Sequence, residues 1–393
     1  APGEGILFLG PRVSFSGSNN TIARYFRVRY GGTSQNQDAS GIANGANIIL
    51  DHMTFTWGTD EVFSVNWDNN GTAPDNITIQ NSIIGQGLHR HNHSAGGLMQ
   101  PPPGGKISLI GNLYICNKTR NNKIKGINEF VNNVVYNWGN YGNTYGHTQS
   151  GEAYIMGGDS AGASYANIIN NYFKPGPITP QNEPIAHRIV KPESGYIEPK
   201  QYGRAYVSGN FIVGSPEVTA DNWNGGVQLE NLPEAETKEF LAAIKQPKPF
   251  SMPQFKIMGA EEAYEYVLAN VGATIPKRDA VDERVIQQVR TGKIEVKDGL
   301  ENSIGKEYIK RRLPADSYKK GIITHPDQVG GYPDYKGTPY KDSDNDGMPD
   351  TYELKNGLNP KDAADAAKIT KNGYSNIENY LNSVVSVSTV KPN

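Results

Sequence analysis

A run of alternating acidic residues near the carboxyl end of the chain has the spacing of a calcium-binding loop. Its members are Asp342, Asp344, Asp346, Gly347, Asp350 and Glu353. They occupy the first, third, fifth, sixth, ninth and twelfth positions of the loop pattern. Carboxylates at alternate positions converge on one cation, the glycine permits a sharp turn, and the final glutamate closes the shell from the start of a helix. We therefore expect this loop to hold a structural calcium ion, with a merely acidic linker as the alternative.

A second set of polar residues follows this loop. Asp362, Asn372 and Glu378 could form a partner loop, as in calcium-dependent modules that pair two half-sites.

The elements that must position an active site are short β-prone runs in the first half of the chain. The runs cover residues 22–29, 48–55, 77–84, 107–115, 130–136, 168–173 and 205–213. Aligning Tyr25, His52, Asn81, Asn112, Asn133, Asn171 and Asn210 gives steps of 27, 29, 31, 21, 38 and 39 residues. Steps of this size are typical of the coils of a parallel β-helix.

In such a solenoid, the repeated asparagines would stack as an amide ladder at one turn. An antiparallel sandwich also has short strands, but it would usually space them by roughly 8 to 12 residues. We therefore predict an all-β fold, a right-handed parallel β-helix. Because coil lengths vary, the extra residues should emerge as loops on one side and build the binding cleft.

From residue 216 onward the pattern changes to helical periodicity. Segments 234–244, 260–270 and 280–290 carry apolar residues at spacings of three and four. Residues 330–341 are rich in Gly, Pro and Tyr, which indicates a linker. We predict a parallel β-helix catalytic domain (1–214), a helical extension that packs on it (215–329), and a linker with an EF-hand-like calcium-binding module (330–393).

The charge balance argues against a nucleic-acid or membrane-surface partner. The 38 Lys and Arg residues nearly match the 40 Asp and Glu residues, so any site for an acidic ligand must be local. Cys116 is the one cysteine in the sequence, which excludes an internal disulfide. No apolar stretch of the sequence approaches the roughly 20 residues of a membrane span.

The segment 38–65, which contains NIILDHMTFTWGTDEVFSV, resembles the WIDH region of the pectate lyases of polysaccharide lyase family one. The resemblance implies that Asp38 and Asp60 are ligands of a catalytic calcium ion. Thr56 stands where the family places a further acidic ligand. Glu61 is then expected to complete the ligand set, unless the carboxylate of the substrate does so.

A second segment, RNNKIKG at 120–126, resembles the RxPxxR segment of the same family. The match implies that Arg120 is the catalytic base. Asn122 replaces the proline, and Lys125 replaces the second arginine. A cation is therefore kept at the substrate-binding position, while the bidentate fork of an arginine is lost.

The histidine-rich segment GLHRHNHSAGG at 87–97 resembles the part of the family that carries a substrate-binding lysine, and Arg90 is expected to take that role. His89, His91 and His93 alternate and would share one face of an extended strand. They could bind zinc or line a sugar subsite. No fourth zinc ligand is evident, which favours a sugar subsite with His93 as a substrate-binding residue.

The resemblance covers about residues 6–210 as a coil pattern. The segment 261–292, with AYEYVL and RDAVDERV, resembles the C-terminal extension of bacterial members. APGEGI, at residues 1–6, resembles an internal stretch of the family, so further coils are expected to precede Ala1.

The resemblance implies a pectate lyase that cleaves α-1,4-linked polygalacturonate by calcium-dependent β-elimination. The reaction removes the proton on the carbon next to a carboxylate, so negative charge builds on an anionic group. Calcium held by Asp38 and Asp60 would absorb this charge, and Arg90 and Lys125 would neutralise adjoining sugars. Arg120 would take the proton. Because arginine normally keeps its proton to above about pH 12, an alkaline preference is expected.

Two other functions fit the same architecture. A β-helix hydrolase of polygalacturonate would need two or three clustered carboxylates, and none is evident beyond the calcium candidates. The departures at Thr56 and Asn122 make a non-catalytic polysaccharide-binding solenoid plausible. For all three functions we expect an acidic plant polysaccharide as the partner. We also expect a monomeric protein that is secreted or periplasmic.

Overall fold

The computed structural model describes residues 4–32, 35–90, 93–139, 151–157, 164–194, 200–297, 313 and 316–386. The chain forms two compact units. The larger unit comprises Leu7–Thr274 and Arg278–Pro333, and the smaller comprises Ala1–Ile6, Ile275–Lys277 and Asp334–Asn393.

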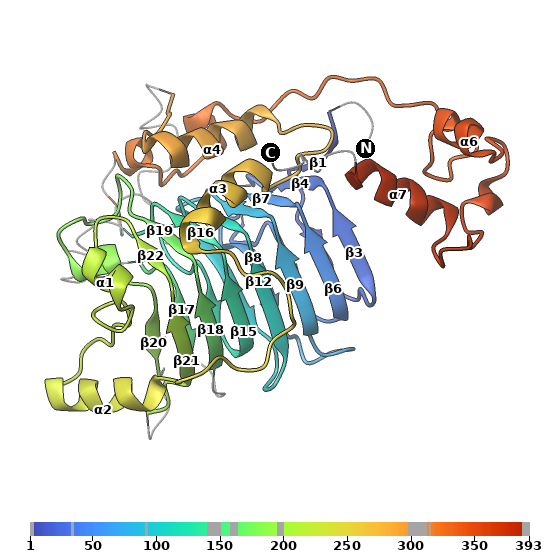
Figure 1. Ribbon diagram of the computed structural model, residues 1–393. Coiled ribbons are helices and arrows are strands. Elements are labelled where there is room, and N and C mark those ends of the chain that lie inside the picture. The colour runs from blue at the N-terminus through green and yellow to red at the C-terminus, as the bar shows by residue number, and fades with distance from the viewer. Residues whose placement is uncertain are drawn as a thin grey trace. The chain divides into compact units, whose positions relative to one another are not determined.

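The larger unit is built on three sheets whose described strands all pair in parallel (Figure 1). Sheet A contains β1 (Ile6–Leu9), β4 (Phe26–Arg29), β7 (Thr54–Thr56), β10 (Ile83–Gly85), β13 (Leu113–Ile115), β16 (Val134–Tyr136), β19 (Tyr172–Lys174) and β22 (Phe211–Ile212). Sheet B contains β2 (Val13–Ser14), β5 (Ser40–Ile42), β8 (Glu61–Asn66), β11 (Ala95–Gln100), β14 (Lys123–Ile124), β17 (Ile155–Gly157) and β20 (Lys191–Glu193). Sheet C contains β3 (Thr21–Arg24), β6 (Ala46–Asp51), β9 (Asp75–Gln80), β12 (Lys106–Ile110), β15 (Gly126–Val131), β18 (Ser164–Ile169) and β21 (Arg204–Ser208).

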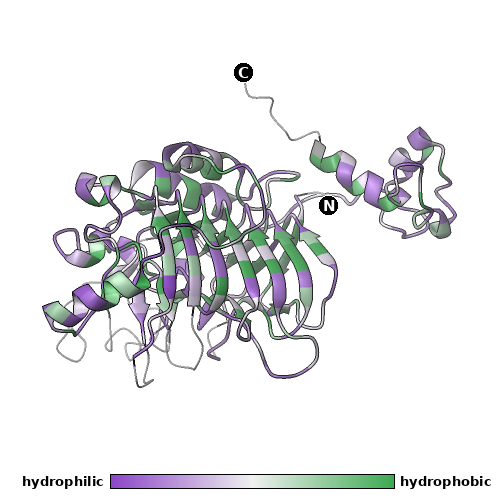
Figure 2. Cartoon of the chain, turned by 60° about the horizontal axis from the view of Figure 1, so that its bottom comes forward, coloured by the Kyte–Doolittle hydropathy of each residue, from purple (hydrophilic) through white to green (hydrophobic). Residues whose placement is uncertain are grey.

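Each coil of the chain contributes one strand to each sheet in turn, so the prediction of a right-handed parallel β-helix is confirmed. Side chains in register stack on one another inside the solenoid. Ile48, Ile77 and Ile107 are paired across β6, β9 and β12 and are at most 1% exposed. Figure 2 shows hydrophobic and hydrophilic residues in bands that run across neighbouring strands. The alternation along each strand therefore builds one continuous apolar core.

The turn from sheet C to sheet A carries an amide ladder. Its members are Asn112, Asn133, Asn171 and Asn210, and Asn222, beyond the last strand, continues it. The side-chain oxygens of Asn133, Asn171, Asn210 and Asn222 each accept the backbone N–H of the preceding member, at 2.8–3.0 Å. The ladder satisfies polar groups in the interior, where an unpaired group would be costly. It links coils of 21, 38 and 39 residues.

The predicted alignment is wrong by one residue in the first three coils. Ser82, not Asn81, is in register with Asn112 and donates its N–H to that side chain. Tyr25, His52 and Asn81 occupy the preceding position, where the backbone is left-handed, with φ of 58°, 53° and 49°. Asparagine is favoured both in a ladder and in the left-handed conformation, so the residue type alone could not distinguish the two positions.

Helices follow the last strand, and two of them cover sheet A. The α-helices of the larger unit in the described part of the chain are α1 (Pro216–Ala220), α2 (Glu234–Ile244), α3 (Ala260–Asn270) and α4 (Ala280–Thr291). Its described 3-10 helices are η1 (Pro184–His187), which precedes β20, and η2 (Ser317–Lys320) and η3 (Pro326–Val329). Apolar residues of α3 and α4 pack on Ile83, Leu113 and Val134 of sheet A (Figure 1). The predicted helical segments 234–244 and 260–270 match the observed bounds.

Buried ion pairs fix α4 against sheet A. Arg27 and Arg29 of β4 have no exposed side-chain surface, and both pair with Asp282, at 3.2 and 2.8 Å. Asp279, the N-cap residue of α4, also pairs with Arg29 at 2.7 Å and accepts the N–H of Asp282. The side-chain cap and the two arginines thus place the start of α4 over β4.

The smaller unit contains the acidic loop and the helices that follow it, α6 (Asp350–Asn356), η4 (Ala363–Asp365) and α7 (Asn376–Ser386). None of the helices in the described part of the chain has the length and apolar character needed to cross a membrane.

The ladder gives a first prediction. Asn171→Ala should lower the free energy of unfolding by about 2–4 kcal/mol, because it leaves buried partners on two neighbouring coils unsatisfied. Asn171 donates to the carbonyl of Phe130 and accepts from Asn133, and it is fully buried. Denaturant unfolding checks the value. Asn70→Ala, in an exposed turn, is the control, and equal stabilities for the two variants would contradict the ladder's role.

Candidate active site

Residues that precede the strands of sheet B come together at one edge of the solenoid. Asp38 precedes β5, Asp60 and Glu61 lie at the start of β8, His93 precedes β11, and Arg120 precedes β14. These strands are consecutive neighbours in sheet B. Because parallel strands place their starting ends at the same edge, residues far apart in the sequence become neighbours there.

Three of these residues form an acid cluster, which consists of Asp38, Asp60 and Glu61. One carboxylate oxygen from each lies within 4.8 Å of the others. The backbone N–H of Glu61 donates to Asp38 Oδ1 at 3.1 Å. Asp60 is held by two neighbours, since Asn36 Nδ2 donates to its Oδ2 at 3.0 Å and His93 Nε2 lies 3.0 Å from its Oδ1. The structure thus brings four of the predicted site residues together.

Arg120 joins the same group through Glu61. Its Nη1 contacts Glu61 Oε1, although the two residues lie two strands apart in sheet B. The intervening strand makes room with glycines, because a Cβ at Gly96 would lie 2.8 Å from the carbonyl oxygen of Arg120. The N–H of Gly97 donates to that oxygen at 2.7 Å. The backbone of Arg120 is thereby held in a left-handed conformation, with φ of 54°.

Crowding of the three acids changes their proton affinity. Burial raises the pKa of Glu61 to about 8, Arg120 opposes the shift, and the charges of Asp60 and Asp38 add to it. Burial also raises the pKa of Asp38. Carboxylates that crowd at such close range are stabilised in the charged form by a cation. Three hard oxygen donors fit calcium better than a soft metal, so this cluster could hold a calcium ion.

Two predicted substrate-binding cations are buried. Arg90 is 8% exposed, and burial together with the charge of Arg90 lowers the pKa of His325. Lys125 is 5% exposed, and its Nζ is shielded from solvent. It follows the short strand β14, where the chain leaves sheet B and enters sheet C. His91, the central residue of the alternating histidines, lies outside the described residues.

Thr56 lies in β7 of sheet A and accepts a hydrogen bond from Arg29 at 3.1 Å. It is the last residue of that strand, whereas the acid cluster lies where strands of sheet B begin.

Some residues of the site carried no signal in the sequence. Asn36 binds Asp60 from an irregular segment before the first acid. Glu152 accepts a hydrogen bond from the hydroxyl of Thr119 at 2.6 Å, beside Arg120, and pairs with Lys191 at 3.1 Å. Glu152 precedes β17 as Arg120 precedes β14, so a correct alignment of the coils would have placed it at the same edge.

The acidic loop of the smaller unit forms a second cluster. Oxygens of Asp342, Asp344 and Asp346 lie within 4.8 Å of one another, and so do those of Asp346, Glu353 and Asp365. Burial raises the pKa of Glu353 to about 7, with contributions from the neighbouring aspartates.

Asp350, predicted as a ligand of this loop, makes other contacts. Its oxygens accept from the N–H and the hydroxyl of Ser343, each at 2.8 Å, and it pairs with Lys341 at 2.9 Å. It therefore fixes the loop to the start of α6 instead of facing the cluster.

The predicted partner set does not converge on a common point. Asp362 caps η4 and pairs with Lys368 at 3.4 Å, while Glu378 accepts from Ser375 at 2.6 Å. Asn372 accepts from Thr370 at 2.6 Å. Asp365, three residues after Asp362, is the residue that reaches the first loop.

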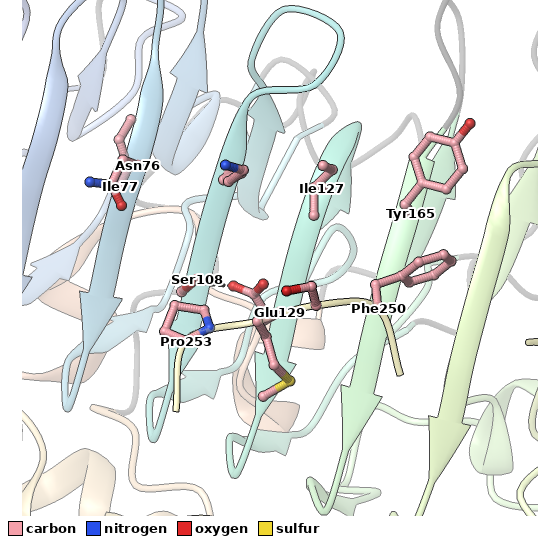
Figure 3. A pocket seen from close by; sticks show the side chains of 11 residues that line it. Asn76, Ile77, Ser108, Ile127, Glu129, Tyr165, Phe250 and Pro253 are labelled. Atoms are coloured by element: carbon pink, nitrogen blue, oxygen red, sulfur yellow. Dashed lines mark hydrogen bonds between the residues drawn. The ribbon is translucent and has the colours of Figure 1, made fainter. Parts of the chain in front are cut away.

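A cavity of about 730 Å³ lies on sheet C, where no site residue had been predicted (Figure 3). Residues of β9, β12, β15 and β18 line it, and the segment 250–253 crosses over it. Glu129 lies at its floor and contacts the hydroxyl of Ser108. The aromatic rings of Tyr165 and Phe250 meet edge to face, 5.6 Å apart. The predicted site residues lie instead at the edge where the strands of sheet B begin.

Comparisons with known proteins give the family. No family model matches the chain. A protein of Aspergillus fumigatus named probable pectate lyase C is 39% identical over 388 residues, which cover 98% of this chain and 77% of that protein. A protein of Aspergillus terreus with the same name is 38% identical over 392 residues, with the same coverage. The chain belongs to the pectate lyase family.

Membership of the pectate lyase family confirms the prediction of a polysaccharide lyase. The assignment to polysaccharide lyase family one and to its bacterial type stays a prediction. A solved pectate lyase of Bacillus sp. N165, in complex with trigalacturonate, shares 14% identity with a TM-score of 0.43. The match covers 69% of this chain and 72% of that one. At this identity and TM-score, the similarity supports no conclusion about the residues of the site.

The raised pKa of Glu61 predicts how pH affects the calcium-free protein. The folded chain keeps a proton on Glu61 that the unfolded chain loses near its ordinary pKa of about 4.3. The stabilisation that the raised pKa of Glu61 contributes is therefore fully present below that pH and is lost as the pH rises to about 8.

Glu61→Gln should reduce this loss by more than about 1 kcal/mol, the energy of one pKa unit. Urea unfolding in chelator at pH 5 and pH 9, for wild type and variant, measures it. An unchanged pH dependence in the variant would contradict the raised pKa.

Proposed function

We propose that this member of the pectate lyase family cleaves polygalacturonate by calcium-dependent β-elimination at the edge of sheet B. The observation that carries the proposal is the contact between Arg120 and an acid cluster whose carboxylate oxygens lie within 4.8 Å of one another. The proposed base and a group of hard anionic ligands therefore share one edge of the sheet. This pairing is what removal of a proton beside a carboxylate requires.

Arg120 is the proposed base. It takes the proton from the sugar carbon next to the carboxylate, the electrons of that C–H bond form a carbon–carbon double bond, and the bond to the glycosidic oxygen breaks. The departing oxygen takes a proton from water. The products are one chain with an unsaturated end and one with an ordinary reducing end, so no water is added to the unsaturated sugar.

Asp38, Asp60 and Glu61 are the proposed ligands of the calcium ion. When bound, calcium would supply positive charge that stabilises the anion formed beside the sugar carboxylate. The same three residues fix where that carboxylate lies relative to Arg120.

Glu61 has a second part in this arrangement. In the structure it contacts the guanidinium of Arg120. As a metal ligand, Glu61 would share its charge with the cation, so its contact with the guanidinium would weaken.

The remaining proposed contacts concern the substrate. His93, whose side chain is 29% exposed and lies beside Asp60, is placed to touch a bound sugar. Arg90 and Lys125 are proposed to act on neighbouring uronate carboxylates, which would require their buried cations to become accessible when substrate binds. The proposal includes secretion, because an acidic plant polysaccharide lies outside the cell that secretes the enzyme, and a monomeric state.

Arg120→Ala should lower the rate of cleavage of polygalacturonate at least about 100-fold, the usual contribution of a general base. The measurement is the ultraviolet absorbance of the new conjugated double bond. Arg204→Ala removes an exposed arginine of sheet C and should keep full activity.

Three results separate the possible functions. Retained activity in Arg120→Ala would remove this residue as the base. Reducing ends without absorbance in the wild-type protein would indicate hydrolysis. Binding of polygalacturonate without either product would indicate a binding protein.

Asp38→Asn should raise the calcium concentration needed for half-maximal rate by about tenfold or more, because a charged ligand is lost. Excess calcium should partly restore the rate, and chelation should abolish it in both proteins. Asp68→Asn, in an exposed turn, is the matched control. A rate that is insensitive to chelator in the wild type would rule out the proposed role of the acid cluster.

A further inference from the structure

The smaller unit has an interior lined by acids from three separate elements. Asp342, Asp344 and Asp346 come from the loop, Glu353 comes from α6, and Asp365 ends the 3-10 helix η4. Asp346 belongs to both of the acidic groups in this unit, so the five carboxylates surround one continuous region. Asp365 lies outside the loop pattern and was not expected there.

Six carboxylate oxygens in this region are buried and accept no hydrogen bond from any residue that the structure describes. They are both oxygens of Asp344, both oxygens of Glu353, Oδ2 of Asp346 and Oδ1 of Asp365. Glu353 has no exposed surface at all. The opposite oxygens of Asp346 and Asp365 are held by backbone N–H groups of Met348 and Asn359, at 2.8 and 2.9 Å. Such hydrogen bonds orient each carboxylate and leave its other oxygen turned to the interior.

Buried carboxylates of this kind need a compensating cation. Among the residues that the structure describes, no lysine or arginine pairs with any of these five acids. Six oxygens match the lower end of the calcium coordination range of six to eight. Magnesium prefers to keep several waters and to bind only one or two carboxylates, which fits this site less well.

The following segment repeats the spacing of the first loop with different chemistry. Lys368, Thr370, Asn372, Gly373, Tyr374 and Asn379 stand where Asp342, Asp344, Asp346, Gly347, Met348 and Glu353 stand in the first loop. The two glycines have similar left-handed backbones, with φ of 96° at Gly347 and 87° at Gly373. The second segment is thus a loop of the same design with neutral or basic residues at the ligand positions.

Hydrogen bonds link these positions directly. The hydroxyl of Thr370 lies 2.6 Å from Asn372 Oδ1 and 2.9 Å from the carbonyl of Tyr374. Asn372 Nδ2 donates to Asn379 Oδ1 at 2.8 Å, and Asn379 Nδ2 donates to Thr370 Oγ1 at 3.0 Å. Lys368, at the first position, carries a positive charge and pairs with Asp362. The side chains at the ligand positions of the second loop are therefore hydrogen-bonded to one another.

We propose that the smaller unit binds a single calcium ion, that Asp365 completes its ligand shell from outside the loop, and that the second loop is closed by side-chain hydrogen bonds in place of an ion. The proposal concerns a site apart from the acid cluster of sheet B. It stands whether or not the proposed function is correct.

The number of bound ions is tested on the full chain with the acid cluster disabled by Asp60→Asn and Glu61→Gln. Calcium titration calorimetry should give one site. Terbium luminescence offers a second readout, because Tyr340 donates to the carbonyl of Gly347 in the first loop at 3.2 Å and can sensitise the ion. Absence of binding would overturn the proposal. Two bound ions, one of them lost on Asn372→Ala, would overturn the ion-free second loop.

The role of Asp365 is tested in the same background against Asp362, which lies at the other end of η4. Asp365→Asn should weaken calcium binding at least tenfold. It should also raise the melting temperature of the calcium-free protein, because it removes one of five mutually repelling charges. Asp362→Asn should leave the affinity for calcium unchanged. Equal affinities in the two variants, or a loss confined to Asp362→Asn, would overturn the assignment.

Discussion

Parallel stacking of successive coils is the constraint on which the rest of the structure depends. Backbone hydrogen bonds hold each strand of sheet B directly beside the strand one coil away. The turn residues that precede these strands are therefore stacked at one edge, whatever the number of residues between them. Asp38 and Arg120 come from turns three strands apart in the sheet, yet both belong to the group around Glu61.

Much of this arrangement could be predicted from the sequence, because periodicity records which residues face the core. The solenoid, two of the helices to the residue, and the grouping of Asp38, Asp60, Glu61, His93 and Arg120 followed from pattern and resemblance. The sequence could not distinguish positions one residue apart in the turn at Asn81 and Ser82, where backbone handedness decides the register. Nor could it predict Asp365, because that contact depends on how η4 folds back toward the loop.

Uncompensated negative charge is common to both units. At the edge of sheet B, the acid cluster is partly balanced by Arg120, and its acids hold protons more tightly than usual. Inside the smaller unit, no described lysine or arginine pairs with the five interior acids, and six of their oxygens accept no hydrogen bond from a described residue. The first arrangement suits a site where an ion and a substrate exchange, while the second suits an ion that stays bound. A cluster of carboxylates can thus suit an exchangeable ion where an arginine lies beside it, or a permanently bound ion where no basic side chain pairs with it.

The unequal coils have a consequence for how such a molecule can diversify. Ladder neighbours are separated by 21 residues in one coil and by 39 in another, yet the strands on either side remain in register. Insertions between strands can therefore reshape the surface loops while the spacing of Arg120 and the acid cluster stays fixed. A loop between two strands could therefore be exchanged to change which polymer binds, while the residues at the edge of sheet B keep their positions.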